Sequence, residues 1–120
     1  MAARKRLICA SEALSDGGQG IRFEIGAGET AQPAFVVRFR GRAQGYLNRC
    51  AHVGIELDWK PGEFFDASGL YLICATHGAL FDPASGQCLA GPCNGQGLVA
   101  LPVCEEAGGV YLIEDGDRSG

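Results

Sequence analysis

The sequence contains no apolar run approaching the roughly 18 residues that a membrane-spanning helix needs, and it has only two histidines among 120 residues. Basic residues are also few, because ten Lys and Arg stand against fourteen Asp and Glu, for a formal net charge of −4. No apolar segment of the secretory type follows the basic first residues. These absences argue against a membrane protein, an exported protein and a nucleic-acid-binding protein. We therefore expect an acidic protein of the cytoplasm.

What the chain does contain is glycine, cysteine and short apolar runs. Its length predicts one domain over residues 1–120, and its 47% hydrophobic content is that of an ordinary globular protein. Nineteen glycines indicate tight turns rather than long helices. Six cysteines without a signal for export favour a metal role over three disulfides.

The apolar runs predict an all-β protein, since they are short, rich in β-branched residues and separated by turn residues. The clearest run alternates, with Ile21, Phe23 and Ile25 on one face of a strand. One helical turn is expected over residues 11–14, with Ser11 as its N-cap. The expected strands are residues 6–9, 21–25, 34–40, 44–47, 70–73, 87–89, 98–103 and 110–113.

Both histidines follow a cysteine at a short distance. Residues 50–52 read C-x-H and residues 74–77 read C-x-x-H, with 22 positions from the first histidine to the second cysteine. Two thiolates and two imidazoles from two loops suit a Rieske [2Fe-2S] cluster, in which cysteines hold one iron and histidines hold the other. The predicted cluster and metal ligands are Cys50, His52, Cys74 and His77.

These pairs belong to a longer pattern. It consists of CAHVG at 50–54, CATHGALFD at 74–82, SG at 85–86 and GP at 91–92. In this pattern the chain resembles the soluble Rieske-type ferredoxins, and the resemblance includes the proline-containing loop that covers the cluster in that family. It implies a Rieske-like iron–sulfur fold of small stacked antiparallel sheets with two cluster-binding loops. It also implies that Cys50 and Cys74 bind one iron, while His52 and His77 bind the other, nearer solvent.

The resemblance implies a soluble one-electron carrier, passing electrons from a flavin- or NADH-linked reductase to a terminal oxygenase or reductase. We expect a monomer with no catalysis of its own, since the sequence offers no nucleophile–base pair and no phosphate-binding loop. Two alternatives remain open. One is a tightly bound accessory subunit of a multicomponent enzyme, resembling that of a nitrite reductase or an oxygenase. The other is a zinc-stabilised interaction module, which the H-G-x-x-F-D continuation at 77–82 disfavours.

The chain departs from other Rieske proteins at several loop positions. Members of the cytochrome bc type have one further cysteine in each ligand loop, where this chain has Ile55 and Thr76. High-potential members place a serine and a tyrosine near the cluster, where this chain has Ala79 and Phe81. Hydrogen bonds to cluster sulfur stabilise the reduced state. We therefore predict a midpoint potential toward the low end of the Rieske range of about −150 to +300 mV.

The 21 residues between the ligand pairs are acidic and partly aromatic. One interpretation is a docking surface for a basic partner. The other, which we favour, is that the aromatic side chains cover the core beneath a solvated charged loop. The residues concerned are Glu56, Asp58, Trp59, Lys60, Glu63, Phe64, Phe65 and Asp66.

Four cysteines lie outside the ligand pairs. Cys9 and Cys104 stand in apolar strand contexts and are interpreted as small buried residues. Cys88 and Cys93 flank the proline-containing loop. For this pair we favour free thiols over a disulfide or a redox role.

Overall fold

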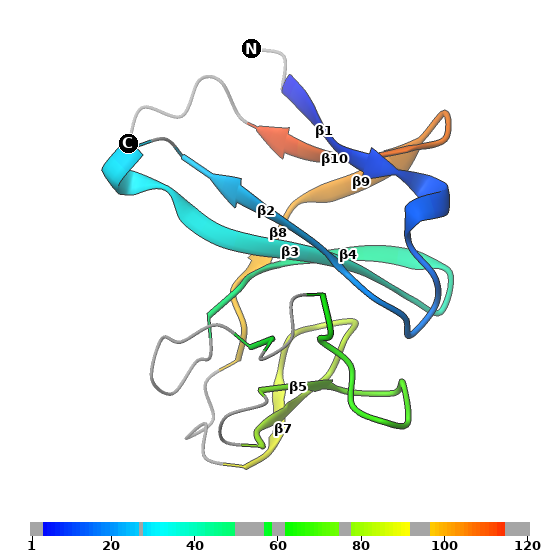
Figure 1. Ribbon diagram of the computed structural model, residues 1–120, viewed down its shortest axis with the longest axis vertical. Helices are drawn as coiled ribbons and strands as arrows, with labels where there is room; N and C mark the ends of the chain where they lie inside the picture. The colour runs from blue at the N-terminus through cyan, green and yellow to red at the C-terminus, as the bar shows by residue number, and fades with distance from the viewer. Residues whose placement is uncertain are drawn as a thin grey trace.

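The computed structural model describes residues 4–26, 28–49, 57–58, 62–74, 78–91 and 97–114. Its strands form three antiparallel sheets, as the sequence predicted (Figure 1). The first sheet contains β1 (Arg4–Ala10), β10 (Gly109–Glu114) and β9 (Val103–Glu106). The second contains β2 (Ile21–Ile25), β3 (Gln32–Phe39), β4 (Arg42–Leu47) and β8 (Ala100–Leu101). The third contains β5 (Leu72–Ile73), β6 (Leu80–Phe81) and β7 (Cys88–Ala90).

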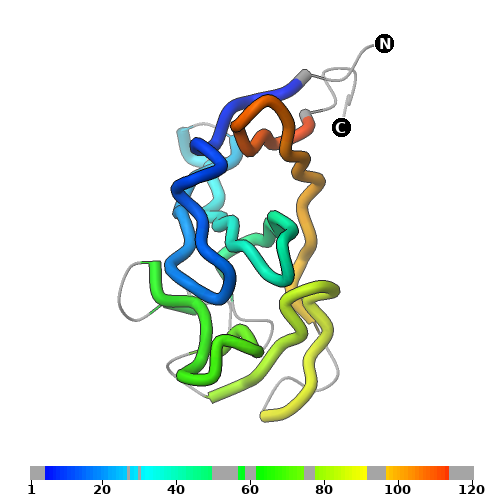
Figure 2. The backbone as a smooth tube through the Cα atoms, turned by 90° about the vertical axis from the view of Figure 1, so that its right-hand side faces the viewer, coloured from blue at the N-terminus to red at the C-terminus, as the bar shows by residue number. Residues whose placement is uncertain are grey.

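The sheets are stacked along the long axis of the molecule. Figure 2 shows β1 and β10 side by side at one end, the four-stranded sheet in the middle and the segment from β5 to β7 at the other end. Two single 3-10 turns, η1 (Ser11–Ala13) and η2 (Gly28–Thr30), connect strands. No helix among the described residues is long and apolar enough to cross a membrane.

Strand β3 contributes to both cores of the molecule. Its residues Ala34, Phe35, Val36 and Val37 are each 0% exposed. Alternate side chains of a strand point to opposite faces. Accordingly Phe35 and Val37 belong to one buried cluster and Val36 to another. The middle sheet is therefore covered on both faces.

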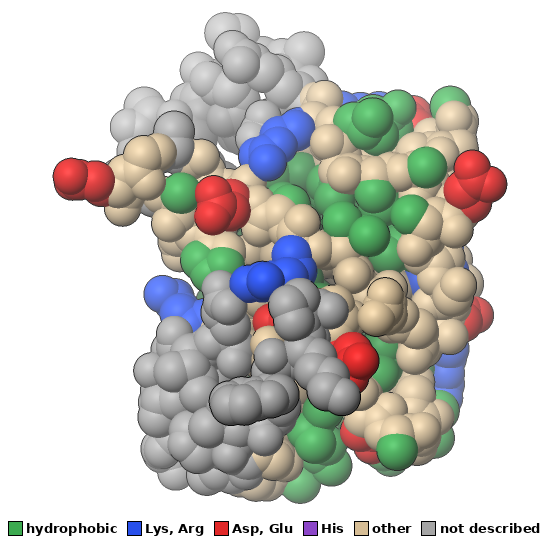
Figure 3. All heavy atoms as spheres, viewed as in Figure 1, with side chains coloured by type: hydrophobic (Ala, Val, Ile, Leu, Met, Phe, Trp, Pro, Cys, Tyr) green, Lys and Arg blue, Asp and Glu red, His purple; other side chains and the backbone are tan. Residues whose placement is uncertain are grey.

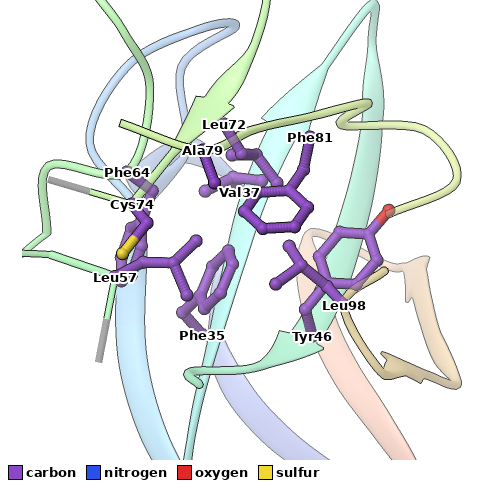
Figure 4. Close-up of a cluster of buried hydrophobic side chains, with 10 residues drawn as sticks. All are labelled: Phe35, Val37, Tyr46, Leu57, Phe64, Leu72, Cys74, Ala79, Phe81 and Leu98. Carbon is purple, nitrogen blue, oxygen red and sulfur yellow. The ribbon is translucent and has the colours of Figure 1, made fainter. Parts of the chain in front are cut away.

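We call the two clusters the lower and the upper core, after their places in Figure 1. The lower core lies between the middle sheet and the segment from β5 to β7 (Figure 4). The upper core lies between the middle sheet and the sheet of β1, β10 and β9. The buried members of the lower core are Phe35, Val37, Tyr46, Leu57, Phe64, Leu72, Cys74, Ala79, Phe81 and Leu98. Those of the upper core are Leu14, Val36 and Val110.

Two details of the predicted strands and one predicted helix cap are wrong. The run predicted as one strand over 98–103 is divided into β8 and β9, because Pro102 has no N–H to continue the ladder. Leu80 and Phe81 form β6, although they were assigned to a loop. Ser11 does not cap its turn: Ala10 is the N-cap of η1, and no side chain caps it. The prediction for β2 is confirmed, including its bounds and its alternating burial.

On the face drawn in Figure 3, basic and acidic side chains are interspersed over the described part of the surface. Cys9 in β1 and Cys104 in β9 were predicted to be buried. Both are free cysteines of the first sheet, and both are half-buried. Burial raises the pKa of the Cys9 thiol. Cys9 packs against the upper core and is therefore mainly a packing group at its edge.

Candidate metal centre

The second of the two predicted ligand loops, residues 74–77, connects the paired strands β5 and β6. Leu72 pairs with Phe81 and Ile73 with Leu80, so the strands close directly below the loop. The backbone N–H of Cys74 donates to the carbonyl of Ala79 at 2.9 Å, and the N–H of Gly78 donates to the carbonyl of Cys74 at 2.7 Å. The chain reverses at Gly78 with a φ of +74°, a conformation that glycine adopts without strain. Cys74 therefore stands at the mouth of a tightly closed loop.

Cys74 forms no disulfide and has no exposed surface. Figure 4 places it at one end of the lower core, beside Phe64 and Leu57, while Tyr46 and Leu98 lie at the other end. Its position is fixed on one side by the hairpin and on the other by aromatic and aliphatic packing. A thiol that is held this way can serve as a ligand without reorganising the chain around it.

The ends of the first ligand loop meet at a buried polar network. Asn48 follows β4 directly and is 1% exposed. Its side-chain oxygen accepts the backbone N–H of Leu57 at 2.8 Å, and its side-chain nitrogen donates to Asp58 at 2.9 Å. The chain thus leaves the sheet at Asn48 and returns against the same side chain. Residues 48 and 57–58 form the neck of the first ligand loop.

The two loops are brought together by one residue of that neck. Leu57 is 0% exposed and packs in the lower core with Cys74. The end of the first loop and the start of the second therefore share one packed region, although the two residues are far apart in the sequence. Of the four predicted ligands the structure describes Cys74, and Cys50, His52 and His77 lie outside the described residues.

A third segment closes against the second loop. Gly91 follows β7 with a φ of +95°, and a Cβ at this position would lie 2.6 Å from the Cα of Ala79. The backbone at Gly91 can approach the loop so closely only because glycine has no side chain. The start of the proline-containing segment is thereby seated on the base of the second ligand loop.

Cys88, in β7, takes part in a disulfide bond. The favoured prediction of a free thiol is therefore wrong at this position. Among the described cysteines, Cys9, Cys74 and Cys104 are free, so the partner of Cys88 lies outside the described residues. Two cysteines separated by a short turn can bridge when the turn brings their Cβ atoms together, and sequence spacing alone does not reveal that.

The segment between the ligand pairs serves partly as core. Phe64 is 0% exposed and stacks on Phe35 with ring centroids 3.9 Å apart. Phe65 is half-buried and stacks on Phe39. Glu63 is exposed, but Asp58 is buried. In the described part of this segment, the aromatic side chains thus cover the core, as the favoured interpretation held. Trp59, Lys60 and Glu56 lie outside the described residues.

The described residues fit an iron–sulfur cluster. A wholly buried thiol stands at the mouth of a loop whose sequence supplies a histidine three residues later, and the neck of a second Cys/His loop packs against it. Soft sulfur and imidazole donors from two loops are the ligand set of the Rieske cluster. Within the described part of the chain no three Cys, His, Asp or Glu side chains converge as a metal site.

The comparison with protein families agrees with this chemistry. Residues 5–105 match the model of the Rieske [2Fe-2S] domain. The chain belongs to this family, and its cofactor is a Rieske-type [2Fe-2S] cluster. The interpretation as a zinc module is therefore abandoned. A cluster of this type changes its charge by one electron, so the chemistry of the chain is one-electron transfer.

Several solved structures share the fold. The ferredoxin of Sphingomonas yanoikuyae B1 is 24% identical with a TM-score of 0.72, and the alignment covers 92% of this chain and 99% of that one. A ferredoxin–oxygenase complex of carbazole 1,9a-dioxygenase contains a chain that is 22% identical with a TM-score of 0.70, over 95% of this chain and 97% of that one.

The fold also occurs inside a larger protein. The terminal oxygenase of carbazole 1,9a-dioxygenase from Nocardioides aromaticivorans IC177 is 18% identical with a TM-score of 0.72. The alignment covers 97% of this chain but 31% of the oxygenase. No curated protein matches the chain.

Sequence reasoning missed the residues that hold the loops in place. Asn48 was assigned no role, and Asp58 was counted among exposed acidic residues. Asn48 is a polar residue directly after the apolar end of β4 and two positions before a predicted ligand, a signal that could have identified it. The burial of Asp58 had no such local signal, since Asn48 and Arg22 come from other parts of the chain.

Proposed function

We propose that the protein is a one-electron shuttle that accepts an electron from a flavin- or NADH-linked reductase and passes it to a terminal oxygenase or reductase. The observation that carries this proposal is the alignment with ferredoxins over nearly their whole length, against about a third of the oxygenase. The matched ferredoxin–oxygenase complex supports an oxygenase as the acceptor.

In this proposal Cys50 and Cys74 hold the inner iron, and His52 and His77 hold the outer iron. The buried position of Cys74 supports its role at the inner iron. The free ring nitrogens of the two histidines are then the exit point for the electron. These imidazoles also couple reduction to proton uptake, because added negative charge raises the proton affinity of a neighbouring histidine.

The ligand set is tested by metal analysis and paramagnetic resonance of the reduced holoprotein. The wild type is expected to contain iron and acid-labile sulfide in equal amounts and to give the signal of a histidine-ligated cluster. Cys74→Ser is expected to lose that signal. Cys104→Ser is the matched control, because Cys104 is also a free cysteine but lies half-buried in β9. A Cys74→Ser variant that keeps the wild-type signal would refute the assignment.

The shuttle is tested by stopped-flow spectroscopy. The reduced protein is mixed with the oxygenase encoded near its gene, and oxidation of its cluster is followed by visible absorbance. Turnover that depends on the concentration of the free protein supports a shuttle. Oxidation that occurs only when the two proteins have first been isolated as one complex contradicts it.

A second candidate is an accessory subunit that stays bound to a larger enzyme. It is favoured by the occurrence of the same fold as one part of a terminal oxygenase. Size-exclusion chromatography with proteins encoded near its gene separates the candidates, since a stable stoichiometric complex is expected only for a subunit. The shuttle proposal expects a monomer.

We also propose that the protein works in the cytoplasm. The free thiols of Cys9 and Cys104 support a reducing compartment, whereas the disulfide of Cys88 is uncommon there. Cell fractionation with an antibody against the chain decides this point.

A further inference from the structure

The neck of the first ligand loop contains a charge that is buried where the fold does not require one. The side chain of Asp58 has 0% exposed surface, and its carboxylate lies 3.3 Å from the Nε atom of Arg22 in β2. Burying a carboxylate carries a desolvation cost that one ion pair repays only in part. A pair of apolar side chains would fill the same space without that cost. What the network adds beyond apolar packing is directional hydrogen bonding, which specifies one geometry.

Its hydrogen bonds have a fixed polarity. The Oδ1 atom of Asn48 accepts the N–H of Leu57, and its Nδ2 atom donates to Oδ1 of Asp58. The second oxygen of Asp58 accepts the N–H of Gly62 at 3.0 Å as well as facing Arg22. An ionised carboxylate only accepts, whereas an amide both donates and accepts. The side chain of Asn48 thus has one productive orientation, and it joins both ends of the loop.

Further hydrogen bonds connect the residues of this network to the rest of the fold. The backbone N–H of Asn48 donates to the carbonyl of Pro33 in β3 at 2.9 Å. The carbonyl of Gly62 accepts the N–H of Gly20 at 2.8 Å. Arg22 comes from the neighbouring strand β2. The neck is therefore held to the middle sheet rather than to its own loop alone.

We propose that Asn48, Asp58 and Arg22 form a clasp that positions Cys50 and His52 for the cluster. The clasp fixes the distance between the two ends of the loop that carries both ligands, and through Leu57 it fixes this loop against Cys74. These three are positioning residues and do not touch the cluster. The proposal rests on the ligand assignment given under the proposed function.

The polarity of the network provides its own rescue experiment. In Asp58→Asn alone, the new amide group has to face another donor. In Asn48→Asp alone, the two carboxylates at positions 48 and 58 face each other as acceptors. In the double variant N48D/D58N, the carboxylate at position 48 accepts from Leu57 and from the new amide. The oxygen of that amide accepts from Gly62 and faces Arg22. Every hydrogen bond is restored, and the negative charge moves from position 58 to position 48.

Three measurements on the holoprotein test the clasp. Hydrogen exchange at the Leu57 amide is expected to become roughly tenfold faster in each single variant, because the buried hydrogen bond between positions 48 and 58, which holds the acceptor of this amide in place, is lost. The half-life of the bound cluster is expected to fall, and the paramagnetic resonance signal of the reduced cluster to shift. The double variant is expected to return all three toward the wild type. The midpoint potential should rise in D58N, which lacks the negative charge.

Glu105→Gln serves as the control, because it breaks an ion pair between β3 and β9, away from the ligand loops. It is expected to lower global stability without changing the cluster signal or the exchange of Leu57. The clasp is refuted if D58N and N48D behave as this control does. It is also refuted if the double variant is no better than the single ones, including the case in which it does not fold. Wild-type protein without iron and labile sulfide would instead refute the ligand assignment.

Discussion

The guanidinium of Arg38 meets the carboxylate of Glu105 at two points, with Nη1 donating to Oε1 at 2.9 Å and Nη2 to Oε2 at 2.7 Å. Arg38 also donates to the backbone carbonyls of Ser11 and Leu14. Planar two-point pairs of this kind are stronger and more directional than single ion pairs. The pair joins β3 in the middle sheet to β9 in the outer sheet, and it holds the turn η1 between them.

This pair makes stability dependent on acid pH. Arg38 lowers the pKa of Glu105 to about 2, from an ordinary value of 4.5. Because the pKa is lowered in the folded state, the stabilisation is complete above pH 4.5 and is lost as the pH falls toward 2. Glu105→Gln is expected to cost about 1 kcal/mol at neutral pH. The difference from wild type should shrink on acidification, measured by urea unfolding at a series of pH values.

Glu106→Gln is the matched control for that series. Glu106 is the neighbouring acid, and its ion pair with Lys5 is about half exposed. The difference between Glu106→Gln and wild type should be near zero at every pH, since exposed pairs contribute little. Equal effects of the two substitutions would contradict the assignment of acid sensitivity to Glu105.

Tyr46→Phe tests the connection between the middle sheet and the turn after β6. Tyr46 is 1% exposed, and its hydroxyl donates to the carbonyl of Pro83 at 2.6 Å. Burial raises the pKa of this hydroxyl, so it remains a donor throughout the neutral range. Its removal leaves a buried carbonyl without this partner, and we expect a loss of about 1–3 kcal/mol in unfolding free energy. The surface substitution Tyr71→Phe should change it by less than about 0.5 kcal/mol.

Gly91→Ala tests the close approach of the chain to the second ligand loop. A methyl group there would meet the Cα of Ala79 at 2.6 Å, so the loop must shift. We expect the variant to bind less iron and to lose its visible absorbance faster than wild type. Gly108→Ala is the control, because Gly108 has a similar φ of +81° but open space around it. Equal iron contents in the two variants would show that the contact does not matter.

Peptide mapping without reduction tests the disulfide of Cys88. Once the free cysteines are excluded, the sequence leaves Cys50 and Cys93 as partners. Because Cys50 is a proposed ligand, we expect the fragment that contains Cys88 to be linked to the one that contains Cys93. A link to Cys50 would contradict the ligand set, and an unlinked Cys88 would contradict the disulfide itself.

The midpoint potential is expected to lie toward the low end of the range of about −150 to +300 mV. Ala79 and Phe81 are both wholly buried and carry no hydroxyl that could donate to cluster sulfur. Ala79→Ser and Phe81→Tyr are therefore expected to raise the potential measured by protein film voltammetry. A wild-type value above roughly +100 mV would contradict the prediction on the same scale.

The sequence predicted those features that depend on neighbouring residues. The alternation of Ile21, Phe23 and Ile25 predicted β2 with its correct bounds, because period-two burial is visible in five residues. The all-β class and the Rieske family followed from short runs and from the Cys/His spacing. Pro102 also carried a signal, since it cannot continue a ladder, but the prediction ran through it.

Features that depend on distant partners were not predictable in this way. The carboxylate of Asp58 is buried among partners from elsewhere in the chain, Asn48 after β4 and Arg22 in β2. Phe64 is a core residue because it stacks on Phe35 in β3. The bridge at Cys88 depends on where the fold brings a second cysteine close to it. Each is decided by tertiary contacts that spacing along the chain does not encode.

The two-faced strand β3 restricts how this chain can vary. Positions 34 to 37 are wholly buried, and the side chains of residues 35 to 37 alternate between the two cores, so this part of the strand has no solvent face on which a change in size can be absorbed. An enlarged residue at Val36 presses on the outer sheet, whereas one at Phe35 presses toward Leu57 and Cys74. A change in side-chain size in β3 is therefore transmitted to the region around Cys74.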